Sequence, residues 1–89
     1  MLFLLSNRTL PNLSAAQYRE LAALAKAFYA SVPTSVSIRG EWAAVDRSAN
    51  YTLLDAADIE TVRRMQSPFE PFTETVITPV MAISGWTNT

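Results

Sequence analysis

The chain has 89 residues, of which 49% are hydrophobic and 17% are charged, and its formal net charge is −1. This length fits one domain spanning residues 1–89, and this composition excludes intrinsic disorder, which needs low hydrophobicity and high charge. The basic residues are scattered, which argues against a nucleic-acid partner because phosphate binding needs concentrated positive charge.

The sequence contains no cysteine and no histidine. It therefore lacks thiolate nucleophiles, disulfides and the commonest metal ligands, so we expect no metal site and no cofactor. Acid–base chemistry would have to use carboxylates, tyrosines or the single lysine. The apolar start is too short for a signal-peptide core and no stretch is apolar enough for a membrane span, so we expect a cytoplasmic protein without a membrane partner.

A strand followed by a helix opens the chain. Residues 1–8 form a short apolar run, typical of a strand covered on both faces, and Pro11 ends it. Ser14 begins a helix, because Ser14 and Gln17 have the spacing of a capping box. Apolar residues then recur at helical spacing up to Pro33. We expect a core stripe and an adjoining second stripe, formed by Leu21, Leu24 and Phe28 and by Tyr18, Ala22, Ala25 and Tyr29.

The middle of the chain, residues 35–55, predicts a β-hairpin with its turn at residues 46–50. In the first strand, Gly40 indicates a bulge or the close approach of another group. Strict alternation would give the two faces Val36, Ile38, Gly40, Trp42 and Ala44, and Ser35, Ser37, Arg39, Glu41 and Ala43.

A second helix and a last strand complete the chain. Asp55 or Asp58 would cap this helix, and Ile59, Val62 and either Met65 or Gln66 would face inward. For Asp55, a capping role is favoured over a catalytic one. Residues 72–83 form the last strand, in which Pro79 marks an edge strand or a bulge. Residues 84–89 form a short tail carrying Trp86.

This element order, β-α-β-β-α-β, is the ferredoxin-like plan of the α+β class. It predicts a four-stranded antiparallel sheet with two helices on one face. The other face would be too apolar for open water, so we expect a second copy of the sheet to cover it, which makes the chain a homodimer.

Two stretches resemble a known family: residues 40–55, GEWAAVDRSANYTLLD, and residues 72–80, FTETVITPV. Their pattern is a glycine, a tryptophan two residues later, a polar turn, an aromatic residue followed by aliphatic residues and an acid, and a strand with Pro-Val. It resembles the DUF3303-type domains of the dimeric α/β-barrel superfamily. The resemblance implies a dimeric α/β barrel, in which two domains pair their sheets back to back.

Relatives in that superfamily include cofactor-independent monooxygenases, muconolactone isomerases, polyketide cyclases and haem-degrading enzymes, and many hold a small ligand between sheet and helices. Several of these enzymes depend on a histidine. In the DUF3303 pattern a histidine often follows the tryptophan, whereas this chain has Ala43. The resemblance therefore does not imply haem ligation or histidine-based cyclase chemistry for this chain.

Arg39, Glu41 and Glu74 are the candidates for catalysis. Arg39 would orient a substrate carboxylate or enolate, and Glu41 would act as acid or base. The alternative, which is favoured because charge pairs are common on strands, is an ordinary cross-strand or intersubunit ion pair on the sheet surface. Glu74 lies in an otherwise apolar strand, where coverage by a dimer would disfavour its charge.

Aromatic side chains form the candidate ligand site, because pockets are mostly apolar with a few placed polar groups. Core packing is the alternative, and it is favoured more for Phe28 and Trp42 than for the tyrosines, whose hydroxyls need partners when buried. The set comprises Tyr18, Phe28, Tyr29, Trp42 and Tyr51.

The sequence thus predicts a small-molecule-binding homodimer with its pocket between the first helix and the sheet. As an enzyme it would be a cofactor-independent isomerase, cyclase or monooxygenase acting on an apolar or aromatic substrate. The alternative is a non-catalytic structural or regulatory module whose sheet edge or Trp86 tail docks onto another protein. The fold does not decide between these functions.

Overall fold

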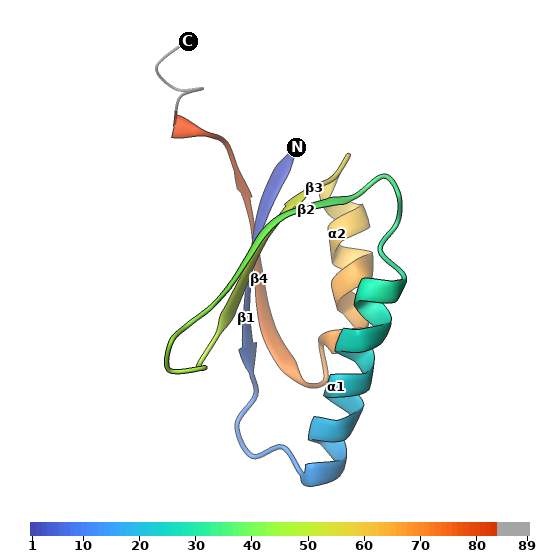
Figure 1. The fold of residues 1–89 in the computed structure, drawn as a ribbon, viewed down its shortest axis with the longest axis vertical. Helices are drawn as coiled ribbons and strands as arrows, with labels where there is room; N and C mark the ends of the chain where they lie inside the picture. The colour runs from blue at the N-terminus through green and yellow to red at the C-terminus, as the bar shows by residue number, and fades with distance from the viewer. Residues whose placement is uncertain (84–89) are drawn as a thin grey trace.

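The computed structural model describes residues 1–83, so the predicted Trp86 tail lies outside the described residues. The chain is ordered as the ferredoxin-like plan requires, which confirms that prediction (Figure 1). Its elements are strand β1 (Leu2–Thr9), helix α1 (Ala15–Ala30), strands β2 (Ser37–Ala43) and β3 (Asn50–Asp55), helix α2 (Ile59–Gln66), the 3₁₀ turn η1 (Ser67–Phe69) and strand β4 (Thr73–Val80).

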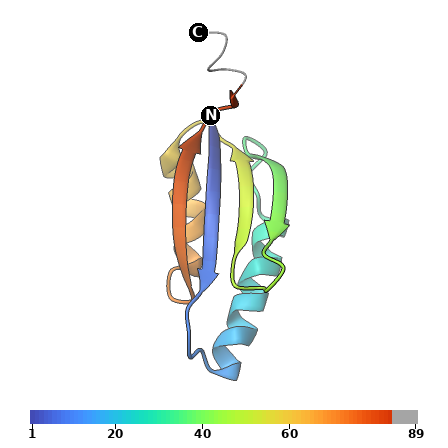
Figure 2. The ribbon, with the colours of Figure 1, turned by 90° about the vertical axis from the view of Figure 1, so that its left-hand side faces the viewer.

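The four strands form one antiparallel sheet in the order β2-β3-β1-β4. Both helices lie on one face of it, and Figure 2 looks onto the other face, which no helix of residues 1–83 covers. β4 is an edge strand, so Pro79, which has no amide hydrogen to donate, fits there as predicted. Within residues 1–83, neither helix has the length and apolar character needed to cross a membrane.

The core lies between the centre of the sheet and α2. Phe3 and Leu5 of β1, Leu54 of β3 and Val62 of α2 are completely buried, with 0% of their surface exposed. Phe3 and Leu54 are directly opposite each other, so they lie on the same, helix-facing side of the sheet. Burying each of these side chains stabilises the fold by about 1.5–3 kcal/mol before entropy is counted.

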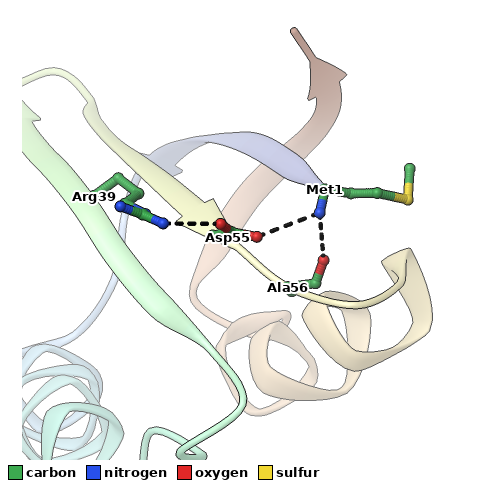
Figure 3. A network of polar contacts seen from close by, with 4 residues as sticks. All are labelled: Met1, Arg39, Asp55 and Ala56. Atoms are coloured by element: carbon green, nitrogen blue, oxygen red, sulfur yellow. Dashed lines mark hydrogen bonds and ion pairs between the residues drawn. The ribbon is translucent and has the colours of Figure 1, made fainter.

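Asp58, one of the two caps that the sequence left open, caps α2, and the capping role favoured for Asp55 is wrong. Asp58 Oδ1 accepts a hydrogen bond from the Thr61 amide at 2.8 Å. Asp55 instead connects three strands at one end of the sheet (Figure 3): Arg39 Nη2 donates to its Oδ2 at 3.1 Å and the Met1 α-amino group donates to its Oδ1 at 3.3 Å. The hydrogen bond from Arg39, with a further one from the amino group, holds the pKa of Asp55 below its ordinary value.

Helix α1 is well capped but loosely packed. Ser14 Oγ accepts from the Gln17 amide at 3.1 Å and Gln17 Oε1 accepts from the Ser14 amide at 2.8 Å, which confirms the capping box. No side chain of α1 is buried, however, and the predicted core stripe of Leu21, Leu24 and Phe28 is only half-buried. The hydrophobic core therefore does not fill the space between α1 and the sheet.

A β-bulge in β2 overturns the predicted alternation of its side chains. Ile38 is opposite Leu54, whereas Gly40 is opposite Leu53, so two steps along β2 match a single step along β3. An extra residue of this kind moves every following side chain to the other face. Ile38 consequently faces the helices, and Gly40 faces the uncovered side of the sheet.

The bulge also separates Arg39 from Glu41. Glu41 is opposite Thr52 on the helix-facing side, while Arg39 binds Asp55 on the uncovered side. The prediction that Arg39 and Glu41 share one face is therefore wrong, and the cross-strand ion pair of Arg39 is made with Asp55.

The ring of Trp42 lies over Gly40. A Cβ atom placed on Gly40 would lie 2.5 Å from Trp42 Cη2, which is closer than real side-chain atoms approach. Gly40 thus has both of the features that its position predicted, a bulge and a close neighbour. Trp42 is still 56% exposed, because nothing else in residues 1–83 covers its outer surface.

Candidate functional site

A cavity of about 380 Å³ lies between α1 and one end of the sheet. Its roof is apolar and comes from Leu21, Ala25 and Phe28 of α1, with Phe69 of η1 beside them. The cavity exists because α1 buries no side chain against this part of the sheet. Its position is the one predicted for a ligand site.

The floor of the cavity is polar because the helix-facing side of the sheet changes character along β1. Phe3 and Leu5 belong to the core, whereas the next residue on the same side, Asn7, lines the cavity. Asn7 is opposite Asn50 of β3, which also lines it. The Thr75 hydroxyl donates to Asn7 Oδ1 at 2.6 Å and so fixes the orientation of this amide.

Tyr29 and Glu41 form a polar pair at the mouth of the cavity. The Tyr29 hydroxyl donates to Glu41 Oε2 at 2.5 Å, which links α1 to β2, and both side chains remain exposed to solvent. The bulge in β2 creates this pair, because it turns Glu41 toward the helices. The hydrogen bond to Glu41, with smaller contributions from burial and from the Glu41 charge, raises the pKa of Tyr29 to about 12. The phenol therefore keeps its proton at neutral pH and holds the carboxylate in place.

Gln66 is the polar residue at the inner end of the cavity. It is the last residue of α2, it lines the cavity, and only 8% of its surface is exposed. Within residues 1–83, no protein group makes a hydrogen bond to its side-chain amide, and no fully buried side-chain atom lacks a partner. The amide therefore faces the cavity, where a bound molecule can use its donors and its acceptor.

A second, more open groove of about 540 Å³ runs between α1 and α2. It is mostly apolar, and the charged residue among its described lining is Arg64. Phe28 and Phe69 line both spaces, and their rings meet edge to face with centroids 5.8 Å apart. These two rings form the partition between the cavity and the groove.

A family model described as "Domain of unknown function (DUF3303)" matches residues 1–88. The chain belongs to the DUF3303 family. The match confirms the resemblance carried by residues 40–55 and 72–80 and extends it over nearly the whole sequence.

The fold of this DUF3303 chain is also found in muconolactone isomerase. The crystal structure of that enzyme superposes with a TM-score of 0.69 at 23% identity, covering 92% of this chain and 90% of the other. At this identity the likeness concerns the fold alone. No curated protein sequence matches the DUF3303 chain.

The structure distributes the predicted ligand residues over two faces of the sheet. Phe28, Tyr29, Trp42 and Tyr51 line the cavity, whereas Tyr18 does not. Trp42 and Tyr51 are opposite each other on the uncovered side, so it is their main chain that borders the cavity. Of the predicted ligand residues, only Phe28 and Tyr29 direct side chains from α1 to this space.

Of the three candidate catalytic residues, only Glu41 reaches the cavity of the DUF3303 chain. Arg39 is held by Asp55 on the uncovered face, and Glu74, opposite Arg8 in β4, is exposed there as well. Glu41 brings one carboxylate, oriented by a neutral phenol, to a cavity with an apolar roof and free amides. This arrangement can bind a small molecule and move a proton on it.

Gln66 and the part of the polar floor that comes from β3 were not recognised as site residues from the sequence. The inward stripe of α2 did include Gln66 as an alternative to Met65, and a polar residue at an inward position was the available signal. The floor had a weaker signal, since Asn50 and Thr52 alternate with Tyr51 and Leu53 as they would on one side of a strand. Within residues 1–83, no group of three or more Asp, Glu, His or Cys residues is arranged to hold a metal ion.

Proposed function

We propose that this DUF3303 protein is a homodimer that binds a small molecule in the cavity beneath α1. The ligand has an aromatic or apolar body and carries hydrogen-bonding groups. The cavity volume of about 380 Å³ carries the proposal, because ligand sites usually measure about 300–1,000 Å³. The apolar roof suits the body of such a ligand, and the amides of Asn7 and Gln66 suit its polar groups.

We extend the proposal to cofactor-independent proton transfer, as in an isomerase or a cyclase. Glu41 takes a proton from a carbon that lies between a carbonyl group and a carbon–carbon double bond; the electron pair of the broken C–H bond forms a new C=C bond, and the π pair of the carbonyl moves onto its oxygen. The Gln66 amide donates a hydrogen bond to that oxygen. The protonated Glu41 then returns the proton to the far carbon of the original carbon–carbon double bond; the enolate electrons re-form the carbonyl, and the C=C bond ends up next to it, while Tyr29 stays protonated and positions the carboxylate.

The uncovered sheet face supports the homodimer. Leu4 and Leu53 are opposite each other on this face and only half-buried, and Val76 is 56% exposed. A second copy of the face would remove these side chains from water. A different protein seated on the same face would correspond to the non-catalytic alternative, and the oligomeric state of the purified protein distinguishes the two.

Side-chain amide NMR tests the ligand site directly. The chain has two glutamines, so among the glutamine side-chain amide signals one comes from the cavity, that of Gln66, and one is an internal control in the capping box, that of Gln17. The signals of Asn7 and Asn50, which also line the cavity, are assigned separately. Titration with aromatic carbonyl compounds should shift the Gln66 signal and leave the Gln17 signal in place. A Gln66→Met variant, which keeps the length of the side chain, should bind on the order of tenfold more weakly. Ligands that bind without moving the Gln66 signal would contradict the proposed site.

Deuterium exchange tests the proposed chemistry. In heavy water the protein should catalyse exchange at the carbon next to the ligand's carbonyl group, and Glu41→Gln should abolish this exchange while leaving the Gln66 signal responsive to ligand. Exchange that persists at the full rate in the Glu41→Gln variant would exclude Glu41 as the base.

A further inference from the structure

The cavity beneath α1 has an unbalanced charge. Among the described residues that line it, Glu41 is the one that carries a formal charge, and no lysine or arginine takes part. The two arginines of the sheet lie on the other face, where Arg39 is paired with Asp55 and Arg8 is opposite Glu74. A ligand in the cavity therefore meets a carboxylate that has no cationic neighbour in the lining.

The pair of Tyr29 and Glu41 offers a ligand at the mouth only hydrogen-bond acceptors. The Tyr29 proton is already donated to Glu41 Oε2, which leaves Glu41 Oε1 and the lone pairs of the phenol oxygen for a ligand. The inner end differs, because the Gln66 amide provides both donors and an acceptor and is 8% exposed. A ligand that satisfies both ends places a donor at the mouth and a group of either kind beside Gln66.

We propose that this cavity selects aromatic ligands bearing a cationic or neutral hydrogen-bond donor, such as aryl amines and aryl amides, and rejects aryl carboxylates. The inference rests on the proposed function, since it assigns the ligand class of the same site. A carboxylate brought to the mouth is repelled by Glu41, whereas an ammonium group can donate to Glu41 Oε1 and to the phenol oxygen of Tyr29. Because solvent at the mouth screens these charges, the change from a cationic to a neutral ligand, and from a neutral to an anionic one, lowers the affinity on the order of tenfold each time.

Three ligands with the same ring test the inference: phenethylamine, phenylacetamide and phenylacetate. Their affinities for the intact protein are measured by calorimetry at low salt, and the Gln66 amide signal shows whether each occupies the cavity. We expect the amine to bind more tightly than the amide and the amide more tightly than the carboxylate, by about tenfold at each step. Added salt should narrow both gaps, which a purely steric preference would not do.

Two variants separate the cavity from the neighbouring groove. Glu41→Gln removes the charge and should bring the three affinities together within about threefold, the size of a weak residual polar preference. Arg64→Gln removes the charge that lines the groove between α1 and α2 and should leave the order unchanged.

The outcomes distinguish failure of the charge selection from failure of the ligand site itself. Phenylacetate binding as tightly as phenylacetamide, with the Gln66 signal shifting for both, would overturn the charge selection and leave the ligand site intact. If no member of the series moves the Gln66 signal, the ligand site fails and the selection fails with it.

Discussion

At the scale of single residues, Gly40 and Trp42 determine each other's positions. The Trp42 ring occupies the space above Gly40 that a Cβ atom would need, 2.5 Å from Cη2. The contact lies on the uncovered face, next to the bulge that turns Glu41 toward the cavity. The geometry on which the site depends is therefore linked to a glycine that does not itself line the cavity.

Replacing Gly40 with alanine should lower the free energy of unfolding by about 1–3 kcal/mol, because the added methyl group overlaps the Trp42 ring. Urea denaturation measures the change. In a Trp42→Ala background the ring is absent, so the same replacement should be neutral or slightly stabilising, since alanine loses less backbone entropy than glycine. Equal losses in the two backgrounds would show that the ring is not the cause.

The hydrogen bond between Tyr29 and Glu41 predicts a pH dependence at the alkaline end. The folded chain holds the Tyr29 proton more tightly than the unfolded chain, with a pKa of about 12 against an ordinary value of 10.0. This contribution to stability is fully present below about pH 10 and is lost as the pH rises toward about 12. Absorbance titration of the phenolate should show one late step, and that step should move to lower pH in Glu41→Gln. A late step unchanged in this variant would argue against the pair.

At the scale of elements, the two helices are held in different ways. α2 places Val62 in the core and ends at the buried Gln66, whereas α1 buries no side chain. The stability of α1 consequently depends more on its capping box and its helix propensity than on packing. A helix of this kind can move away from the sheet at low cost, which would suit an element that roofs the proposed ligand site.

Hydrogen–deuterium exchange should reveal this difference. The amides of α1 should exchange earlier than those of β1, which is the central strand with Phe3 and Leu5 in the core. Ser14→Ala removes the cap and should reduce the protection of α1 by about 1 kcal/mol, with a smaller effect on β1. Ser35→Ala, an exposed serine outside the helices and strands, is the matched control and should change neither. Equal protection of α1 and β1 would contradict this account.

The ion pairs of Asp55, which link β2, β3 and the start of the chain, predict a pH dependence of stability at the acidic end. Arg39 and the Met1 amino group lower the pKa of Asp55, so the ionised form is favoured by folding. The stabilisation is present above the ordinary pKa of aspartate, about 4, and is lost as the pH falls through the lower folded value. The thermal unfolding temperature of the Asp55→Asn variant should be lower than that of the original protein at pH 7, and the difference between the two temperatures should shrink in acid. A constant difference at all pH values would assign the effect to something other than charge.

At the scale of the whole molecule, the two faces of the sheet have different roles. The helix-facing side holds the core and the cavity, while the uncovered side carries Leu4, Leu53, Trp42 and Val76. Figure 2 shows that both helices lie behind this face of the sheet, so it is the face that a second copy would cover under the proposed function.

Val76→Lys should convert the proposed homodimer into a monomer, because it places a charge on the face that a second copy would cover. Light scattering after size exclusion measures the mass, and circular dichroism checks that the fold is kept. Val45→Lys changes an equally apolar, fully exposed residue of the β2–β3 turn and should leave the dimer intact. A parent protein that is a monomer at micromolar concentration would contradict the dimer.

The sequence was sufficient for the architecture because each element has a local signal. Periodic apolar residues, the Ser14 capping box and Pro79 depend on neighbours within a few positions. The face of Glu41 was not predictable in this way, because a bulge depends on how β2 aligns with β3, and alternation alone cannot count the extra residue. The cavity was beyond the sequence for a similar reason: how far α1 stands from the sheet depends on packing, so Gln66 could be placed inward but not beside an empty space.

The aromatic partition of Phe28 and Phe69 has a consequence for engineering. Two rings separate a chamber with an acidic mouth from a groove with a basic residue. Truncating Phe28 to alanine would join them into a single passage beneath α1, with a carboxylate at one entrance and a guanidinium group at the other. One substitution would thus turn the proposed site for donor-bearing rings into a site for elongated zwitterions.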